Sequence, residues 1–404
     1  MTTSPALTRV ARGDTCTGCG LCAALAPDAV AMTTVAPGYA RPHQHGTVAA
    51  DAEARIAASC PGLVIDNGPV KAGADALWGA ATTVATGHAT DPALRHHASS
   101  GGVLSALLTH ALGTGMVDRV VQTTSDPANP LGNSTTVSRS AEDVFAAAGS
   151  RYASSSPLAA IMDQLAQPGR FAFVGKPCDV SALRALARVD PRVDAKVPLM
   201  LAFFCAGIPS GDGARRILAA ADAPEDEVVA FRYRGDGWPG DATATLRDGT
   251  TRAMGYHASW GQILSKQIQF RCKICPDAVG GAADVACADA WYGDARGYPS
   301  FAEQDGRSLL LARTPAGEAL VRSAIAAVNI AIEPLPLAAI AQMQPSQVRR
   351  KRELIARLAA MAVAGRPVPR YRGVRLLAAA RQATPVQQLR SFAGLVRRIV
   401  QGRA

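Results

Sequence analysis

Eight of the nine cysteines fall into two sets of four, and a cysteine thiolate can bind zinc or an iron–sulfur cluster. The first set begins in the run DTCTGCGLC at residues 14–22 and consists of Cys16, Cys19, Cys22 and the distant Cys60, which precedes a proline. Bacterial ferredoxins hold a 4Fe–4S cluster with such a triplet and a further cysteine before proline. The spacing therefore predicts one 4Fe–4S cluster. A zinc loop is the alternative, although zinc sites more often use two C-x2-C pairs.

The second set is built around a C-x2-C hook, Cys272 and Cys275, in the stretch FRCKICPDAVGGAADVACADAW. Two thiolates are only half of a four-ligand sphere, so two more sulfurs must come from elsewhere in the chain. Cys178 follows the run RFAFVG and Cys205 follows LMLAFF, and both runs are typical of buried strands. If these strands are parallel, both cysteines emerge at the same carboxyl edge of a sheet. The alternative is an ordinary buried cysteine, which is what we expect of Cys287 on its own strand.

Strand and helix patterns alternate through the middle of the chain. We expect helices at 103–111, 141–148, 158–167, 180–188, 213–221, 259–269 and 315–328, and strands at 116–123, 170–175, 197–204 and 308–313. This alternation predicts an α/β core with a mainly parallel sheet. Residues 62–95 are predicted to form a linker around a short strand, and residues 228–254 to be rich in β structure.

A polar run precedes the helix predicted at 103–111 and consists of Ser99, Ser100, Gly101 and Gly102. Free backbone N–H groups and the helix dipole favour an anion at such a position, and glycines let a phosphate approach closely. A plain serine cap followed by flexible glycines is an equally good interpretation. Further along, Trp238 could stack on a flavin or a substrate, or be an ordinary half-buried tryptophan.

The bulk composition is that of an ordinary protein, with 404 residues, 48% apolar and 18% charged. This length allows two or three compact units. No apolar run approaches the roughly 18 residues that span a bilayer, and the N-terminus lacks the apolar centre of a secretion signal. We therefore expect a cytoplasmic protein, in which cysteine clusters bind metal more often than they form disulfides.

The positive charge is concentrated at the C-terminus. Residues 349–404 contain 14 Lys and Arg against one acid, whereas the rest of the chain has 28 against 31. This asymmetry predicts a basic docking segment and argues against a nucleic-acid-binding domain. The last helical stretch places Leu389, Phe392, Leu395, Val396, Ile399 and Val400 on one side. It could bind a partner or the membrane periphery, or equally pack on the body of the protein.

Several motifs together resemble the coenzyme F420 hydrogenase/dehydrogenase beta-subunit family, which is related to 7-hydroxymethyl chlorophyll a reductase and to ferredoxin-type divinyl chlorophyllide reductase. The matching segments are SSGGVLSALLTHAL, AAGSRYASSSP, GKPCDVSALRAL, FFCAGIP, FRYRGDGWPG and RCKICPDAVGGAADVACADAW, spread over roughly residues 80–330. The resemblance implies an FAD held by the α/β core, a core 4Fe–4S cluster and often a second, ferredoxin-like cluster. Together with the charge distribution, this leads us to expect three parts: a ferredoxin-like 4Fe–4S segment at 1–70, a flavin- and cluster-binding core at 80–345, and a basic helical tail at 346–404.

Residue by residue, the resemblance implies that Cys178, Cys205, Cys272 and Cys275 hold the core cluster. It implies that the flavin diphosphate faces the 99–102 run, with further candidate cofactor contacts at Gly149, Ser150, Arg151, Tyr152 and Lys176. The spacing of the N-terminal cysteines differs from that of the vinyl reductases, so the substrate is the least determined part of the expectation.

The expected function is that of an iron–sulfur flavoprotein oxidoreductase. Electrons would pass between a ferredoxin-like or deazaflavin carrier and a hydride acceptor through two 4Fe–4S clusters and FAD. An acidic ferredoxin would be attracted to the basic segment. One alternative is a non-catalytic electron-transfer subunit that depends on a redox partner subunit. Another is a binding protein in which the cysteines hold structural zinc.

Overall fold

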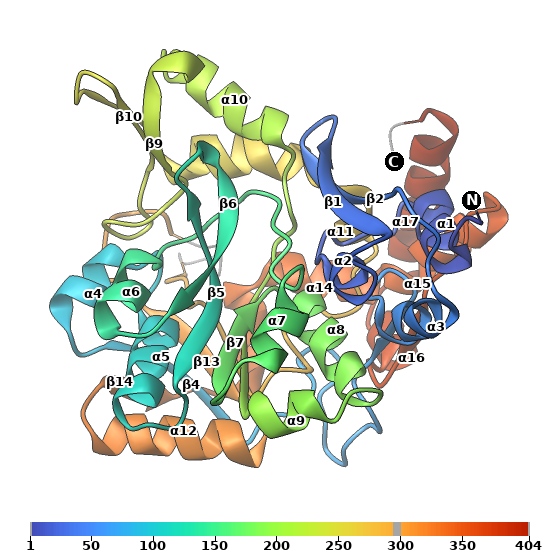
Figure 1. The fold of residues 1–404 in the computed structure, drawn as a ribbon. Helices are drawn as coiled ribbons and strands as arrows, with labels where there is room; N and C mark the ends of the chain where they lie inside the picture. Colours follow the sequence, from blue (N-terminus) through green and yellow to red (C-terminus); the bar gives the residue numbers. More distant parts are fainter. Residues whose placement is uncertain (1, 294–299, 403–404) are drawn as a thin grey trace.

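A computed structural model of the chain describes residues 2–293 and 300–402 (Figure 1). Its centre is an eight-stranded sheet with the order β14-β4-β13-β12-β8-β7-β5-β6. In chain order the strands are β4 (Thr83–Ala89), β5 (Arg119–Asp126), β6 (Asn129–Ser138), β7 (Phe171–Gly175), β8 (Leu199–Phe203), β12 (Val285–Asp289), β13 (Ser308–Ala312) and β14 (Ile330–Pro334). The pairs β12–β8, β8–β7 and β7–β5 are parallel. The four outer pairs are antiparallel, so the α/β class is confirmed and the sheet is mixed.

Helices cover both faces of this sheet, as expected from its central strands β7 and β8, which contain no polar side chain. Alternate residues point to opposite faces of a strand, so a strand buried on both sides needs an unbroken apolar run. On one face, Ala172 and Val174 of β7 pack with α5 (Val103–Gly113), α6 (Ala141–Ala146) and α12 (Pro315–Ala326). On the other, Phe171 and Phe173 pack with α7 (Ile161–Ala166), α8 (Pro177–Ala187) and α9 (Arg192–Lys196). Cys287 is buried on β12, as predicted.

Local sequence signals start several of these helices. Thr314 caps α12 by accepting a hydrogen bond from the Gly317 N–H, and a proline follows at the first helical position. Ser140 and Asp143 form a capping box at the start of α6. The residues expected to be helical at 259–269 instead form a π-helical segment, His257–Ile263, and a 3₁₀ turn, Leu264–Lys266.

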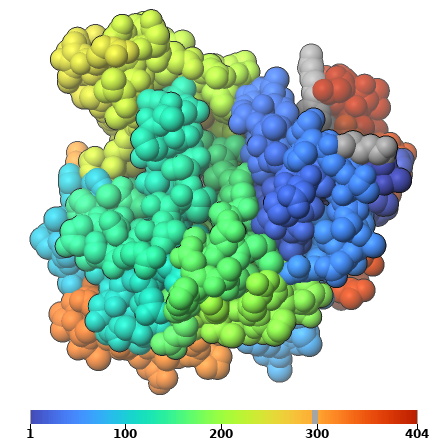
Figure 2. Space-filling view, in the orientation of Figure 1, coloured from blue at the N-terminus to red at the C-terminus, as the bar shows by residue number. Residues whose placement is uncertain are grey.

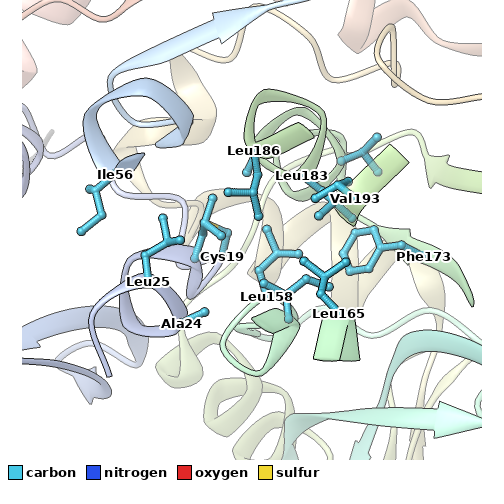
Figure 3. Close-up of a cluster of buried hydrophobic side chains, with 14 of the residues drawn as sticks. Cys19, Ala24, Leu25, Ile56, Leu158, Leu165, Phe173, Leu183, Leu186 and Val193 are labelled. Atoms are coloured by element: carbon cyan, nitrogen blue, oxygen red, sulfur yellow. The ribbon is translucent and has the colours of Figure 1, made fainter. Parts of the chain in front are cut away.

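The N-terminal segment packs directly on the central sheet and its helices. It contains α1 (Pro5–Gly13), α2 (Leu21–Leu25), the hairpin β1 (Val30–Val35) with β2 (Tyr39–Gln44), and α3 (Ala50–Ser59). Cys19, Leu25 and Ile56 belong to the same apolar cluster as side chains of α7, α8 and β7 (Figure 3). In the space-filling view the blue N-terminal segment lies against the green middle of the chain and the red C-terminal helices (Figure 2).

A smaller antiparallel sheet, with the order β11-β10-β9, lies apart from the central sheet at the top of Figure 1. It consists of β9 (Val228–Arg232), β10 (Ala242–Leu246) and β11 (Thr251–Met254), and its apolar side packs against α10 (Gly211–Ala220). The prediction of a β-rich stretch at 228–254 is therefore confirmed.

The stretch at 62–95 is more ordered than a linker. It contains β3 (Val64–Asp66), the central strand β4 and α4 (Pro92–His97). Strand β4 pairs with both β13 and β14, and Ala85 and Ala89 are fully buried. The expected short strand is therefore confirmed, but the linker around it is not, because the surrounding residues form further regular structure.

The C-terminal segment folds back on the rest of the protein. It contains α14 (Pro345–Arg352), α15 (Leu354–Val363), β15 (Arg370–Arg372), α16 (Leu376–Ala380) and α17 (Pro385–Val400). Strand β15 pairs in parallel with β3. Leu395 is fully buried, and Phe392, Val396 and Ile399 pack with residues of α15 and with Phe270 and Ile274. Of the two alternatives for this helix, packing on the protein itself is the one observed. Among the described residues, no helix combines the length and apolarity needed to cross a membrane.

Candidate functional site

The four N-terminal cysteines surround one small cavity. Cys16 and Cys19 lie in the loop between α1 and α2, Cys22 lies in α2, and Cys60 directly follows α3. All four line the same cavity, together with apolar side chains such as Leu7. Burial, and then the charge of Cys16, raises the pKa of the Cys60 thiol to about 12. A thiol in this environment stays protonated unless a metal holds it as the thiolate.

The loop around this cavity is anchored to the core. The N–H of Leu158 donates to the Cys19 carbonyl oxygen at 2.9 Å, and the Ser156 hydroxyl donates to the Gly18 carbonyl oxygen at 2.9 Å. The Gly18 N–H points at the Cys16 sulfur, with the nitrogen 3.4 Å away. Backbone N–H groups directed at sulfur are typical of cysteines that hold iron–sulfur clusters.

The second set gathers at the carboxyl edge of the parallel strands. Cys178 lies in the first turn of α8, directly after β7, and Cys205 lies two residues after β8. Because β7 and β8 are parallel, both cysteines are at the same edge, as predicted. Cys272 lies on the short helix α11 (Phe270–Lys273) and Cys275 lies just beyond it.

The hook meets the end of β8 through direct contacts. The N–H of Ile208 donates to the Cys272 sulfur at 3.4 Å, and the N–H of Cys205 donates to the Ala278 carbonyl oxygen at 2.9 Å. Burial, and then the charges of Cys272 and Cys275, raise the pKa of the Cys205 thiol to about 12. Burial raises the pKa of Cys178 as well, and the charges of Cys205 and Cys275 add to that rise. Three distant parts of the chain thus bring four sulfurs within electrostatic reach of one another.

The donor set and its surroundings suit iron–sulfur clusters. All nine cysteines are free thiols. Within the described part of the chain, no three or more His, Cys, Asp or Glu side chains converge on a point where a single metal ion could sit. A cube of four irons and four sulfides is larger than one ion, and each set supplies the four thiolates that it needs. The small cavity among the N-terminal cysteines lies where such a cube would have to be.

A second cavity, of about 880 Å³, lies between the small sheet and the edge of the central sheet. Its lining comes from residues 124–130, 146–151, 229–245, 255–257 and 301–303. Arg234 is fully buried there, with both oxygens of Asp289 2.8 and 2.9 Å from Nη1. Its guanidinium packs over the rings of Trp238, Tyr256 and Trp291, at 4.7 to 5.3 Å from their centroids.

The size and lining of this cavity fit a flavin dinucleotide. Cofactor sites are concave, largely apolar and aromatic, with a few polar groups that orient the ligand. The buried polar atoms on its lining residues that lack a hydrogen-bond partner within the described structure include Arg234 Nη2 and Trp238 Nε1. Buried donors of this kind normally have a partner, so a polar ligand would complete them. Trp238 itself is fully buried, not half-buried.

The predicted flavin residues do not all lie at the 880 Å³ cavity. Gly149, Ser150 and Arg151 line the 880 Å³ cavity. The Arg151 guanidinium, however, is occupied by protein, because it donates to the Phe231 carbonyl at 2.7 Å and to the Gly132 carbonyl at 2.6 Å. Tyr152 packs against Trp260, with ring centroids 4.6 Å apart and the ring planes tilted by 44°.

The 99–102 run connects to this cavity through its first serine. The Ser99 hydroxyl accepts a hydrogen bond from the Ser150 N–H and donates to the Arg234 carbonyl at 3.3 Å. Ser100 instead donates to the Arg307 carbonyl at 3.0 Å. A Cβ on Gly101 would lie 2.6 Å from the Gly87 carbonyl oxygen, so this glycine lets two parts of the protein approach closely. The run thus has a packing role in addition to any role toward a ligand.

Lys176 lies away from the cavity and beside the core cysteines. Its ammonium is 2.8 Å from an Asp179 carboxylate oxygen and donates to the Ser155 hydroxyl at 2.9 Å. Burial penalises its charge, but the carboxylate and the nearby cysteines outweigh burial and raise its pKa. Lys176 is therefore a buried cation next to Cys178.

Sequence reasoning missed three arginines of these sites. Arg234 was visible only as part of the FRYRGDGWPG segment, and nothing in that segment shows that it stacks on three aromatic rings. Arg271 and Arg350 contact the cysteine segments through backbone carbonyls, which leave no pattern in the sequence.

Comparison with known proteins identifies the family. Models of the coenzyme F420 hydrogenase/dehydrogenase beta subunit match residues 84–163 with their N-terminal part and residues 169–337 with their C-terminal part. The F420-dependent formate dehydrogenase 1 subunit beta of Methanococcus maripaludis is 24% identical over 228 residues, or 55% of this chain and 57% of that protein. The coenzyme F420 hydrogenase subunit beta of Methanococcus voltae is 23% identical over 259 residues, or 61% and 81%. The chain thus spans little more than half the length of the formate dehydrogenase subunit.

A solved structure shares the fold. A chain of the F420-reducing NiFe hydrogenase complex from Methanosarcina barkeri superposes with a TM-score of 0.53 at 21% identity, covering 70% of this chain and 96% of that one. The first cysteine set and the C-terminal segment lie outside both ranges that match the family models. Those ranges together include more than half of the residues, and this chain therefore belongs to the coenzyme F420 hydrogenase/dehydrogenase beta-subunit family.

Proposed function

We propose that this protein is an iron–sulfur flavoprotein that passes electrons between a ferredoxin-like or deazaflavin carrier of the coenzyme F420 type and a hydride acceptor. Two 4Fe–4S clusters, held by the two cysteine sets, and one FAD are its proposed cofactors. The observation that carries the proposal is that eight cysteines gather in two sets beside each other. FAD, when bound, exchanges electron pairs as hydride and single electrons with clusters.

The proposed flavin site is the 880 Å³ cavity. Arg234, fixed by Asp289, would supply an N–H donor from Nη2, and Trp238 would supply an indole N–H. The hydrogen bond between Ser99 and Ser150 would hold the two predicted flavin-binding segments at one side of the cavity. The relatives named above are F420-dependent by name, which supports a deazaflavin as one carrier.

A second candidate function is that of an electron-transfer subunit without turnover of its own. It is favoured by the relatives, which are named as beta subunits of a formate dehydrogenase and of a hydrogenase. The described part of α17 has exposed apolar side chains, with Leu389 67% and Val400 79% exposed, next to arginines. This basic surface is our proposed docking site for an acidic carrier or partner subunit, or for the membrane periphery.

The deciding experiment is anaerobic purification followed by an optical spectrum and iron, sulfide and flavin analysis. We expect about eight irons and one flavin per chain, as two four-iron clusters and one FAD require. Reduced deazaflavin and reduced ferredoxin should then each bleach the spectrum. A preparation without flavin and iron would end the proposal. Turnover only after addition of a stoichiometric partner would favour the second candidate.

A further inference from the structure

Helix α14 in the C-terminal segment directs three hydrogen-bond donors at the residues that follow β8. Arg350 donates from Nη1 to the Cys205 carbonyl oxygen at 2.9 Å and from Nη2 to the Ala206 carbonyl oxygen at 2.5 Å. Gln347 donates from Nε2 to the same Cys205 oxygen at 3.1 Å. Gln347 and Arg350 are three positions apart and so share one face of the helix.

These bonds satisfy carbonyls that regular structure leaves without partners. Strand β8 ends at Phe203 and α10 begins at Gly211. The peptides between them therefore take part in neither the strand nor the helix hydrogen bonds. Buried backbone carbonyls of this kind need a donor from elsewhere. With its N–H bonded to Ala278 and its carbonyl bonded to α14, the Cys205 peptide is held from both sides.

The charge of Arg350 is not neutralised by its own segment. Glu353 is the single acid in residues 349–404, and its carboxylate pairs with Arg357 at 2.6 Å. Arg357 in turn donates to the Lys273 carbonyl at 2.8 Å, inside the C-x2-C hook. The segment thus contacts both halves of the core cysteine set, and it brings a fixed positive charge to the Cys205 side.

We propose that Arg350, assisted by Gln347, is a positioning residue for the core cysteine set that fixes Cys205 against the hook and raises the reduction potential of the cluster bound there. The effect on the reduction potential rests on the proposed function, in which a cluster is bound there. A cluster gains negative charge on reduction, so a nearby fixed cation and donors in its second shell favour the reduced form. Neither family model extends to residue 350.

The test uses the full-length chain with Arg350→Gln, Arg350→Lys and the matched control Arg349→Gln, an exposed arginine one position away. In the cluster-free chain, the rate of Cys205 alkylation by iodoacetamide is measured by mass spectrometry, with the buried Cys287 as internal reference. We expect a several-fold faster rate in Arg350→Lys, which keeps the positive charge but lacks the planar fork that spans both carbonyls. In Arg350→Gln the lost charge also raises the pKa of the Cys205 thiol, so the acceleration should be smaller than in Arg350→Lys. Arg349→Gln should match the parent.

In the loaded protein, the core cluster is titrated by electron paramagnetic resonance at controlled potentials. For Arg350→Gln we expect about a tenfold lower ratio of reduced to oxidised cluster at a given potential, equal to a 59 mV fall for one electron. Arg350→Lys keeps the charge and should shift the ratio less.

The proposal is overturned if Arg350→Gln behaves like Arg349→Gln in both measurements. If the parent chain takes up no cluster, the proposed function fails, while the alkylation rates still decide whether Arg350 positions Cys205. Should Arg350→Gln fail to fold by circular dichroism, Gln347→Met removes only the third donor. It should then give a smaller acceleration of Cys205 alkylation, and no acceleration counts against the proposal.

Discussion

Arg271 donates a hydrogen bond from Nη2 to the carbonyl oxygen of Pro61 at 2.9 Å, and this bond joins the two cysteine sets. Pro61 follows Cys60 in the first set, and Arg271 precedes Cys272 in the second. The guanidinium is buried and lies over the Tyr371 ring, 5.7 Å from its centroid. The sets therefore belong to one packed body, which is the arrangement that electron transfer between two clusters requires.

Each cysteine set should bind its iron separately. Cys272→Ser removes one sulfur of the core set, so we expect the iron content to fall from about eight to about four per chain. Cys19→Ser should cause the same fall while sparing the core signal. Iron analysis and electron paramagnetic resonance of the reduced proteins check this. Cys287→Ser is the control and should retain all the iron, because that residue is buried on β12. Full iron content in Cys272→Ser would contradict the assignment.

Flavin binding should weaken when the indole N–H of Trp238 is removed. Trp238→Phe keeps an aromatic ring but eliminates the unpartnered Nε1 donor at the 880 Å³ cavity. A hydrogen bond contributes about 1 kcal/mol net, so we expect the FAD dissociation constant to rise several-fold. Fluorescence titration of the flavin-free chain measures it. Trp260→Phe is the matched control, because Trp260 packs on Tyr152 and is not among the cavity lining. Equal affinities in both variants would place the flavin elsewhere.

Stability should depend on pH through His110. Burial lowers the pKa of this imidazole below its ordinary value of 6.5. The unfolded chain then binds more protons than the folded one as pH falls below 6.5, so the free energy of unfolding decreases there. Structurally, Nδ1 accepts from the Asn329 amide and Nε2 donates to the Ser323 hydroxyl, each at 2.8 Å, and a second ring proton would break the first bond.

The corresponding measurement is denaturant unfolding between about pH 8 and about pH 5.5. His110→Gln should be less stable at the upper end but lose less stability than the parent as the pH falls. His43→Gln, at an exposed position, should keep the parental pH profile. If the unfolding free energy of His110→Gln changed with pH as it does in the unmodified protein, the pKa of this imidazole would not be lowered by folding.

Helix α17 should stabilise the protein through one side only. Leu395 is fully buried against the cluster of α15 and Phe270, so Leu395→Ala should cost about 2–5 kcal/mol of unfolding free energy. Leu389 is 67% exposed, and Leu389→Ala should change it by less than about 0.5 kcal/mol. Chemical denaturation compares the two. Equally small effects would mean that α17 is detached from the body in solution.

Local spacing in the sequence was enough to predict the two cysteine sets and the α/β class of the fold. The triplet of Cys16, Cys19 and Cys22 and the hook of Cys272 and Cys275 are short patterns whose geometry is fixed by a few peptide bonds. The apolar runs of β7 and β8 likewise predicted buried strands, and the parallel pairing then placed Cys178 and Cys205 at one edge. A short strand was expected within residues 62–95, but the bounds of β4 and its central position were not predicted, because its small residues have no distinctive period without the neighbours that bury them.

Only the tertiary structure decided what surrounds those cysteines. Arg350 reaches the Cys205 carbonyl across 145 positions of sequence, and Arg271 reaches Pro61 across 210. The tertiary structure also assembled the 880 Å³ cavity from five stretches of the chain, and it packed the basic C-terminal segment beside the hook. The physical reason is that a hydrogen bond to a backbone carbonyl requires no particular residue on the accepting side. Such contacts leave no periodic or compositional trace, and they are set by how the helices and sheets pack.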